Sequence, residues 1–363
     1  MDEKIQQILS NYDLGGPIVS CEEFGNGHIN WTYRIETAAG DQFVLQQINT
    51  YVFRDPVGLQ RNIELLTDFM RQKEDDPRKV LEFVKSKDGK TYVVNEDDEF
   101  WRIYVFVRDS VCYDKAESDE IFRESGRTFG HFHNLLADFP VEELVETIPD
   151  FHNTPVRYRN FEAALTEDAV NRAAGAKEEI DYVLSQKAFA SFLLDKVETG
   201  EIPLRVTHND TKINNILFDQ KTQKGLCVVD LDTTMPGIPA MDFGDCIRYA
   251  GNNSAEDEKD LDKVFLRMDL FKVFAEGYCS MSRKNLSREE LLICPEASKL
   301  ITLETGMRFL ADYLQGDVYF HTAYPEHNLV RARVQFKLAR DMDRNMEAMR
   351  DVIISVLDHK DVL

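Results

Sequence analysis

The sequence feature that most constrains the fold is a short loop between apolar segments at residues 206–218. An apolar lead enters a His-x-Asp sequence that ends at Asp210, and Asn215 opens a second apolar segment five residues later. Residues 219–225 are polar and end in glycine, which predicts a turn into another apolar segment ending at Asp230. A hairpin of this kind would bring Asn215 and Asp230 close together.

This order of side chains is typical of a kinase catalytic loop. There an aspartate, here Asp210, receives the proton of the acceptor hydroxyl, while an asparagine and a later aspartate hold Mg²⁺ on the nucleotide phosphates. Asn215 and Asp230 supply the oxygen ligands that Mg²⁺ prefers, and Lys212 could reach the transferring phosphate. Asp and Asn also form ordinary turns, but the apolar flanks, the spacing and the second aspartate together favour the catalytic reading.

Composition sets wide bounds on the protein. The 363 residues are 43% hydrophobic and 30% charged, which indicates a soluble globular chain long enough for two lobes. The net charge of −22 disfavours nucleic acids and anionic membranes as partners, and no obligate protein partner is implied. The six cysteines form no CxxC pair, and the N-terminus does not look like a signal peptide, so a reducing cytoplasmic location is expected.

The N-terminal region predicts a short helix followed by antiparallel strands. The helix is expected at 3–12 and the strands at 18–24, 31–36 and 43–48. Gly25-Asn26-Gly27 lies between the first two strands, where a glycine loop lets the backbone approach nucleotide phosphates; a plain hairpin is the alternative. His28 follows the glycines and could touch phosphate or acceptor, or could be an ordinary turn histidine.

A helix is expected at 56–73, with proline at its start and apolar residues along one face. It carries Glu64 where a kinase keeps the acidic partner of its strand-three lysine. Strand three has Gln46 in place of that lysine, so the phosphate charge must be met by metal, by Lys212 or by a basic residue such as Arg61. Taken alone, this departure argues for a non-kinase or a pseudokinase.

Further strands at 80–85, 91–94 and 100–107 are expected to complete the sheet, and the backbone at Phe106 and Val107 is the expected partner of adenine. From residue 119 the apolar spacing becomes helical. The helices are expected at 121–139, 158–174, 178–184, 189–198, 300–315 and 329–357. The fold class is therefore α+β, a two-lobed protein-kinase-like fold. Residues 1–110 are expected to form a small antiparallel β-rich nucleotide-binding lobe, and residues 111–363 a larger, mainly helical lobe that carries the catalytic loop.

Several polar residues of the helical part have individual expected roles. His131 and His133 are expected to pack or cap helices. Asp242 is expected to cap a helix. Asp245 is expected to bind the acceptor, because it should begin a helix that faces the catalytic loop. Arg308 lies in an apolar segment, so it should be partly buried and need a ligand or a structural ion pair.

Longer strings of the sequence resemble a known family. They are residues 25–30, 43–47, 205–217, 229–233, 235–237, 242–245, 306–314 and 324–330. Together they resemble the aminoglycoside phosphotransferase and choline kinase superfamily, and within it most closely the N-acetylhexosamine 1-kinases. The Gln46-Gln47 pair is shared with those closer relatives, so the missing lysine becomes a family feature.

The resemblance implies ATP- and Mg²⁺-dependent phosphorylation of the anomeric hydroxyl of N-acetylglucosamine or N-acetylgalactosamine. Asp210 would orient or deprotonate that hydroxyl, Lys212 would help neutralise the phosphates, and Asn215 and Asp230 would hold Mg²⁺. The nucleotide-binding candidates are Gly25, Asn26, Gly27, Gln46, Phe106 and Val107. The sugar-binding candidates are His28, Asp245, Tyr249, Arg308 and Tyr319, with Tyr249 standing where the relatives are expected to have Phe.

Two alternatives stay open at this point. One is a kinase of the same superfamily for another alcohol, such as an aminoglycoside, choline or homoserine. Choline would call for an aromatic cage and an aminoglycoside for a strongly acidic groove, whereas a buried Arg308 favours a neutral polyol. The other is a catalytically silent nucleotide-binding or scaffold protein.

Overall fold

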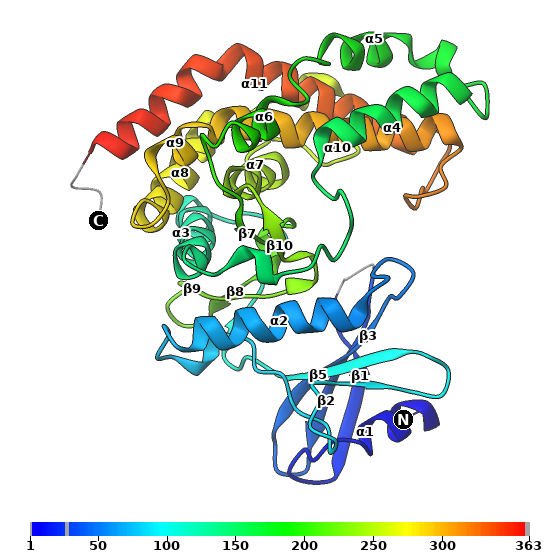
Figure 1. The fold of residues 1–363 in the computed structure, drawn as a ribbon, viewed down its shortest axis with the longest axis vertical. Helices are drawn as coiled ribbons and strands as arrows, with labels where there is room; N and C mark the ends of the chain where they lie inside the picture. Colours follow the sequence, from blue (N-terminus) through cyan, green and yellow to red (C-terminus); the bar gives the residue numbers. More distant parts are fainter. Residues whose placement is uncertain (1, 26–28, 360–363) are drawn as a thin grey trace. The chain divides into compact units, whose positions relative to one another are not determined.

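The computed structural model describes residues 2–25 and 29–359, so the predictions for Asn26, Gly27 and His28 lie outside the described residues. The chain divides into two compact units. The smaller comprises residues 1–111, 142–149 and 217–235, and the larger comprises residues 112–141, 150–216 and 236–363. Figure 1 shows an antiparallel sheet in the first unit and mostly helices in the second, which confirms the α+β, protein-kinase-like fold class.

The smaller unit is built on a five-stranded antiparallel sheet in the order β1-β2-β3-β5-β4. Its strands are β1 (Ile18–Glu23), β2 (Trp31–Thr37), β3 (Gln42–Ile48), β4 (Tyr92–Val94) and β5 (Phe100–Val105). The helix α1 (Glu3–Leu9) buries Ile5, Ile8 and Leu9 in one cluster with sheet residues such as Leu45 and Trp101. Ile35 of β2 and Val44 and Leu45 of β3 are buried, and the first three strands form where they were predicted.

The strand predicted at 80–85 is wrong. In the structure this segment forms a single bridge, Phe83 with Tyr104, flanked by the hydrogen bonds Val84 N to Ile103 O and Val105 N to Glu82 O. The reason is competition for one edge of β5, because β4 already pairs with residues 100–102 and leaves little of that edge.

The helix α2 (Pro56–Arg71) follows its prediction closely. Asp55 accepts a hydrogen bond from Gly58 N at 2.8 Å, and Pro56 begins the first turn. Within the same unit, Asn62 donates from Nδ2 to Val145 O at 2.8 Å and to Thr234 O at 3.2 Å. The buried amide therefore connects α2 to the segment that follows Asp230.

A second sheet contains β6 (Ser110–Val111), β8 (Ile216–Asp219) and β9 (Gly225–Val228), in the order β6-β8-β9. Neighbouring β8 and β9 confirm the predicted hairpin. After β9 the chain enters a short 3-10 helix, η5 (Leu231–Thr233), and Asp230 at its start has φ 58° and ψ 57°. Other short 3-10 helices are η1 (Pro77–Lys79), η2 (Val141–Glu143), η3 (Ala173–Ala176), η4 (Ile213–Asn215) and η6 (Leu261–Lys263).

The larger unit is mainly helical, with one two-stranded pairing of β7 (Arg205–Thr207) and β10 (Met235–Gly237). Its helices are α3 (Asp119–Leu136), α4 (Thr154–Glu167), α5 (Lys177–Ser185), α6 (Phe192–Glu198), α7 (Pro239–Ala250), α8 (Met268–Ser282), α9 (Arg288–Leu292), α10 (Cys294–Gln315) and α11 (His327–Asp358). The predicted helix at 158–174 is displaced, because Asn153 caps α4 early and Asp168 ends it in the left-handed conformation.

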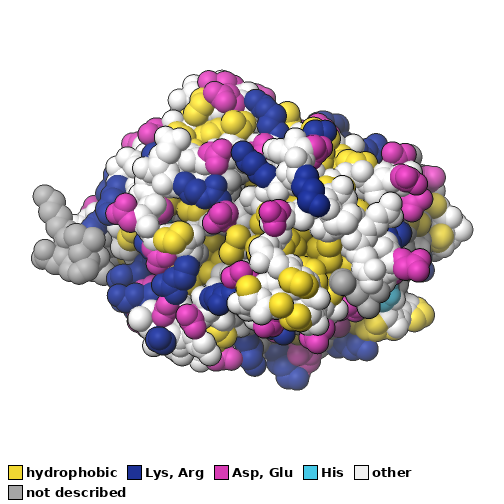
Figure 2. Space-filling model, turned by 90° about the horizontal axis from the view of Figure 1, so that it is seen from below, with side chains coloured by type: hydrophobic (Ala, Val, Ile, Leu, Met, Phe, Trp, Pro, Cys, Tyr) yellow, Lys and Arg dark blue, Asp and Glu magenta, His cyan; other side chains and the backbone are white. Residues whose placement is uncertain are grey.

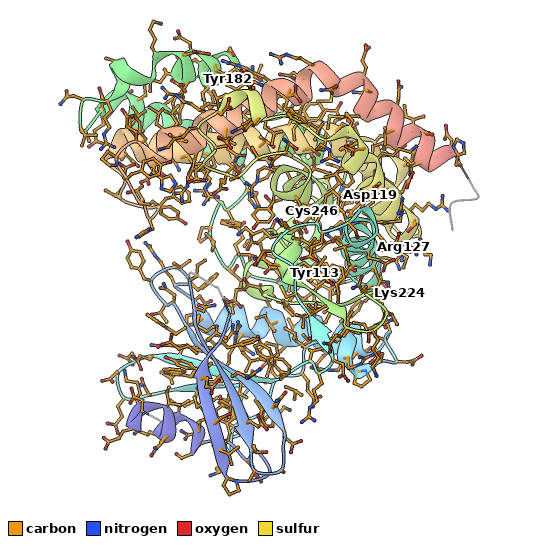
Figure 3. The ribbon with its side chains drawn as sticks, turned by 180° about the vertical axis from the view of Figure 1, so that it is seen from behind. Tyr113, Asp119, Arg127, Tyr182, Lys224 and Cys246 are labelled. Carbon is orange, nitrogen blue, oxygen red and sulfur yellow. The ribbon has the colours of Figure 1, made fainter. Side chains whose placement is uncertain are left out.

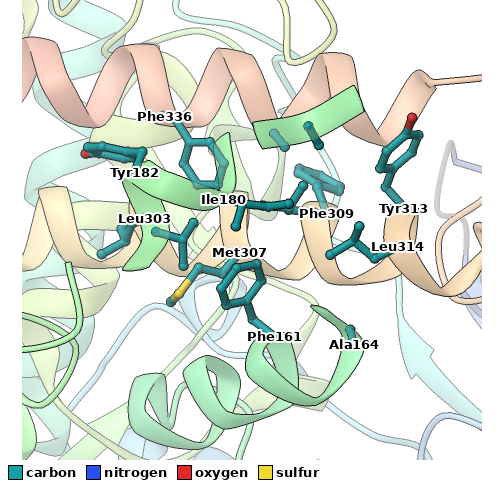
Figure 4. Packing of buried hydrophobic residues seen from close by; sticks show 14 of the residues in the cluster. Phe161, Ala164, Ile180, Tyr182, Leu303, Met307, Phe309, Tyr313, Leu314 and Phe336 are labelled. Carbon is teal, nitrogen blue, oxygen red and sulfur yellow. The ribbon is translucent and has the colours of Figure 1, made fainter. Parts of the chain in front are cut away.

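The core of this unit surrounds α10. Figure 4 shows Phe161 of α4, Met307 of α10 and Phe336 of α11 packed together, with Ile180 of α5 closing the cluster. All four side chains are buried, and Phe161 and Met307 are fully inaccessible. Hydrophobic burial on several sides of α10 therefore fixes its position in the unit.

The helices α3 and α8 approach closely at glycines that face the opposing backbone. A Cβ added at Gly277 would lie 2.1 Å from Arg123 O, and one at Gly130 would lie 2.4 Å from Tyr278 O. Any larger residue at these positions requires the helices to separate.

The face of the molecule shown in Figure 2 carries many charged side chains of both signs. In Figure 2 basic and acidic side chains are interspersed over the face in view, with hydrophobic side chains between them. No helix in the described part of the chain is long and apolar enough to cross a membrane.

Candidate active site

The loop that follows β7 carries the predicted catalytic pair. Lys212 Nζ lies 2.9 Å from Asp210 Oδ1, and both side chains are half-buried. Burial would raise the pKa of Asp210, but the Lys212 ammonium, with His208 and Arg248, more than offsets this and holds the pKa below its ordinary value. Asp210 is therefore an ionised carboxylate at neutral pH, as a proton acceptor requires.

The buried carboxylate of Asp242 holds this loop from α7. It accepts hydrogen bonds from His208 N at 2.7 Å and from Asn209 N at 2.8 Å, and it lies 2.9 Å from His133 Nε2. The prediction that Asp242 caps its own helix is wrong: Ile238 is the N-cap residue of α7, and the Asp242 carboxylate turns to donors more than thirty residues away.

Two further contacts join α7 to the same loop. Thr211 Oγ1 donates to Asp242 O at 2.6 Å, and Cys246 Sγ donates to Thr211 O at 2.8 Å. Cys246 can be found on α7 in Figure 3. One hydrogen bond runs from a loop side chain to the α7 backbone and the other from an α7 side chain to the loop backbone, and together they fix the loop relative to this helix.

A second clamp reaches the loop from α10. His152 lies 3.1 Å from Asn209 O through Nε2 and 2.7 Å from Glu304 Oε1 through Nδ1. Both partners are acceptors, so both ring nitrogens should carry a proton. Burial lowers the pKa of His152, but Glu304 and the Asn209 carbonyl raise it above its ordinary value overall. Thr154 also donates to Glu304, at 2.6 Å, so the buried carboxylate is fully paired.

Asn215 fits the role of a metal ligand. Its Nδ2 donates to Asp210 O at 2.8 Å and to Asp210 Oδ2 at 3.3 Å, which fixes the amide orientation. Its Oδ1 accepts no hydrogen bond among the described residues, and an amide oxygen beside a carboxylate is a suitable donor for Mg²⁺. The second predicted ligand, Asp230, belongs to the smaller unit and begins η5 in the left-handed conformation.

The other nucleotide-site candidates lie in the smaller unit. Gly25 has φ +84°, which favours glycine. Gln46 Oε1 accepts hydrogen bonds from Arg102 Nε at 3.0 Å and Nη2 at 2.7 Å. At the predicted adenine-binding segment, Phe106 N already donates to Gln42 O, and Val107 O accepts the Ser110 hydroxyl.

In the larger unit Arg308 lies among three aromatic rings, one of which is that of Tyr319. The Arg308 guanidinium lies 5.4 Å from the ring centre of Phe151, 5.9 Å from that of Tyr319 and 5.6 Å from that of Phe320. Arg308 is half-buried, as predicted, and within the described part of the chain its donors form no hydrogen bond or ion pair. They remain available to hydroxyl or carbonyl oxygens of a ligand.

Asp245 does not begin a helix, because Pro239 starts α7 six residues earlier. Its Oδ1 accepts a hydrogen bond from Arg248 Nε at 2.8 Å, and both side chains are buried. Tyr249, on the same helix, is half-buried, and burial raises its pKa.

A family model described as the phosphotransferase enzyme family matches residues 20–273. The chain belongs to this phosphotransferase family.

Solved structures with the phosphotransferase fold cover nearly the whole chain. An aminoglycoside phosphotransferase from Alicyclobacillus acidocaldarius is 13% identical, covers 96% of each chain and has a TM-score of 0.66. A microcompartment-associated aminopropanol kinase is 18% identical, covers 96% of this chain and 98% of its own, and has a TM-score of 0.59. An amicoumacin kinase in complex with AMP-PNP, Ca²⁺ and Ami is 13% identical, covers 93% of each chain and has a TM-score of 0.58. At these identities the likeness establishes the fold.

Glu64, the expected acidic partner of a strand-three lysine, and Arg61, an expected substitute for that lysine, have other partners in this phosphotransferase, and Lys212 is paired with Asp210. Glu64 Oε1 accepts a hydrogen bond from the Thr91 hydroxyl. Arg61 is exposed and donates to Glu143 O at 2.7 Å. Lys212 stays charged: burial lowers its pKa, but Asp210 and Asp245 raise it above its ordinary value.

Sequence reasoning missed three polar side chains with extensive buried contacts in this phosphotransferase. His152 and Glu304 clamp the loop from positions about 57 and 95 residues away in the chain, and no local pattern marks them. Arg102 was also missed, although a charged residue inside the apolar strand 100–105 was a usable signal.

Proposed function

We propose that this phosphotransferase transfers the γ-phosphoryl group of ATP to the anomeric hydroxyl of an N-acetylhexosamine, either N-acetylglucosamine or N-acetylgalactosamine. The observation that carries the proposal is the clamped loop, which presents the ionised Asp210 beside the charged Lys212 at 2.9 Å. Family membership supports the phosphoryl transfer, and the sequence strings shared with N-acetylhexosamine 1-kinases support the acceptor.

In the proposed reaction, the anomeric oxygen forms a bond to the γ-phosphorus while the bond from that phosphorus to the β–γ bridging oxygen breaks. ADP leaves with the bridging oxygen, and the hydroxyl proton passes to Asp210. An anomeric hydroxyl is more acidic than an ordinary alcohol, so a carboxylate of low pKa is an adequate base. Lys212 would neutralise charge on the transferring group and keep Asp210 ionised.

Asn215 and Asp230 would hold Mg²⁺, and residues 1–110 would bind the nucleotide through Gly25, Asn26, Gly27, Gln46, Phe106 and Val107. When bound, Mg²⁺ neutralises charge on the β- and γ-phosphates. Two observations support this assignment: the amide oxygen of Asn215 accepts no hydrogen bond from the residues that the structure describes, and amicoumacin kinase was solved in complex with AMP-PNP and Ca²⁺. We assign catalysis and sugar binding to residues 111–363.

For the acceptor, we infer that Arg308 donates to sugar oxygens while Tyr319 contributes an aromatic face. A neutral polyol suits a guanidinium whose donors have no partner in residues 2–25 and 29–359, whereas a choline ammonium would be repelled by it. His28, Asp245 and Tyr249 are the remaining sugar-binding candidates. The free thiols of all six cysteines support action in the cytoplasm.

The test is an ATP and Mg²⁺ assay with N-acetylgalactosamine, N-acetylglucosamine, galactose, choline and kanamycin, with ³¹P NMR to locate the phosphate. We expect an anomeric phosphate on the N-acetylated sugars, and loss of turnover with retained nucleotide binding in Asp210→Asn. Asp181→Asn, an exposed substitution on α5, is the matched control. Phosphate on choline or kanamycin alone would replace the acceptor assignment, and no turnover on any acceptor would favour a silent nucleotide-binding protein.

A further inference from the structure

A buried cation from the neighbouring strand contacts Gln46, the residue at the position of the missing strand-three lysine. In the sheet register Arg102 of β5 stands opposite Gln46 of β3, and its Nε and Nη2 both donate to Gln46 Oε1. Nη2 also lies 2.6 Å from Asp232 Oδ1. The side chains of Arg102 and Asp232 are each 2% exposed, so this guanidinium is shielded from solvent.

Asp232 extends the contact to Asn30, the residue before β2. Its Oδ2 accepts a hydrogen bond from Asn30 Nδ2 at 2.7 Å, and Asn30 Oδ1 accepts from Asn49 N at 2.9 Å. Asp232 Oδ1 has the Arg102 ion pair and no aligned hydrogen bond among the described residues. The charge of Asp232 is therefore compensated mainly by Arg102, and the two residues depend on each other.

The ion pair lies two residues beyond the proposed metal ligand Asp230. Asp230 adopts φ 58° and ψ 57°, a conformation that costs a non-glycine residue energy and persists where its surroundings hold it. Asp232 anchors η5 through Arg102 and Asn30, and Thr234 O accepts from Asn62 Nδ2 on the far side of η5. The strained residue thus sits at the start of a turn that is fixed on both sides.

We propose that Arg102 is a positioning residue: acting through Asp232, it holds Asp230 in the orientation that binds the metal of the nucleotide complex. This rests on the proposed function, in which Asp230 is a Mg²⁺ ligand. Arg102 thus does not take over phosphate binding from the missing lysine, because its Nε and Nη2 are directed at Gln46 and Asp232 inside the sheet. The phosphate charge falls to the metal and to Lys212.

The test uses a nonpolar replacement of the pair, Arg102→Met with Asp232→Leu, because removing both charges leaves neither one buried alone. Binding of AMP-PNP is measured by calorimetry with and without Mg²⁺, beside urea unfolding and the KM for Mg²⁺ at saturating ATP. We expect metal-free AMP-PNP affinity to stay within twofold of wild type, the gain in affinity from Mg²⁺ to fall about tenfold, and the KM for Mg²⁺ to rise by a similar factor.

Two further variants make the result specific. Arg102→Lys keeps the buried charge without the forked geometry and should recover part of the Mg²⁺ response. Arg333→Met removes the partner of Glu179 in the larger unit and should leave the Mg²⁺ response unchanged.

The outcomes separate the possibilities. A folded double variant with a wild-type Mg²⁺ response would reduce the pair to a structural one and overturn the proposal. So would a loss of metal-free AMP-PNP affinity, which would assign Arg102 to phosphate binding instead. If wild-type protein gains no AMP-PNP affinity from Mg²⁺, the proposed function fails first, and the inference fails with it.

Discussion

Replacing Asp242 by asparagine tests whether the catalytic loop depends on one buried carboxylate. Asp242 is 1% exposed, and its two oxygens accept hydrogen bonds from His208 N and Asn209 N while His133 Nε2 lies 2.9 Å away. An asparagine of the same shape offers one acceptor oxygen and one NH₂ group. Whichever way the amide is turned, one backbone N–H of the loop then faces another donor.

The expected loss of stability follows from the hydrogen bonds that the asparagine cannot make. A hydrogen bond to a charged group contributes about 1.5–3 kcal/mol, and an unsatisfied buried donor costs about 1–3 kcal/mol, so we expect a destabilisation of roughly 4 kcal/mol. For a unit of about 225 residues this lowers the melting temperature by about 10 °C. A small displacement of the loop would move Asp210 out of its catalytic position, so kcat should also fall by about 100-fold.

The assay pairs differential scanning calorimetry with steady-state kinetics well below the melting temperature. Glu179→Gln is the control, since it removes a buried carboxylate bonded to Arg333 Nε at 2.6 Å on α5, away from the loop. It should lower the melting temperature and leave kcat near wild type. A melting temperature for Asp242→Asn within about 2 °C of wild type, or an equal loss of kcat in both variants, would refute the reasoning.

Three other predictions concern charge and packing. Lys212→Met removes the cation that lowers the pKa of Asp210, and activity is lost as pH falls through that pKa, so the acid limb of kcat/KM should move to higher pH; an unmoved limb would contradict this. His152 has a raised pKa and its carboxylate partner a lowered one, so their pair stabilises fully between about pH 4.3 and 6.5 and less outside that window. The difference in melting temperature between wild type and His152→Gln should therefore be largest there, and a difference that is constant from pH 4 to 9 would argue against the ion pair. Gly277→Ala should destabilise by about 1–3 kcal/mol in thermal unfolding, because its Cβ would lie 2.1 Å from a carbonyl oxygen of α3, whereas Gly175→Ala, with no atom within 4 Å, should be close to neutral.

Local sequence patterns predicted the elements whose causes are local. The stripe along α2 with Pro56 at its start, and the polar turn between β8 and β9, each carry their own signal, and both elements form where expected. The segment at 80–85 shows the limit of such signals. Its sequence suits a strand, but whether a strand forms depends on which neighbour occupies the edge of β5.

The supporting residues of the site were harder to predict because their partners are distant in the chain. Asp242 follows Pro239 by three residues, which is consistent with a helix start, yet its carboxylate bonds the loop backbone at His208. His152 and Glu304 are 152 residues apart, and no period of 2 or 3.6 connects them. The loop aspartate and asparagine were recognisable from spacing, whereas the residues that hold them in place follow from tertiary structure.

The helix α10 gives the protein a strict length requirement. Within its 22 residues, Glu304 contacts His152 beside the catalytic loop, Met307 packs in the core and Arg308 lies among the aromatic rings. Neighbouring positions of one helix therefore lie in three different environments. Inserting or deleting one residue upstream of Glu304 would turn everything beyond it by about 100° about the helix axis. Substitutions along α10 can be absorbed one at a time, but a change of its length cannot, so lineages of this protein should vary in the composition of α10 and keep its residue count.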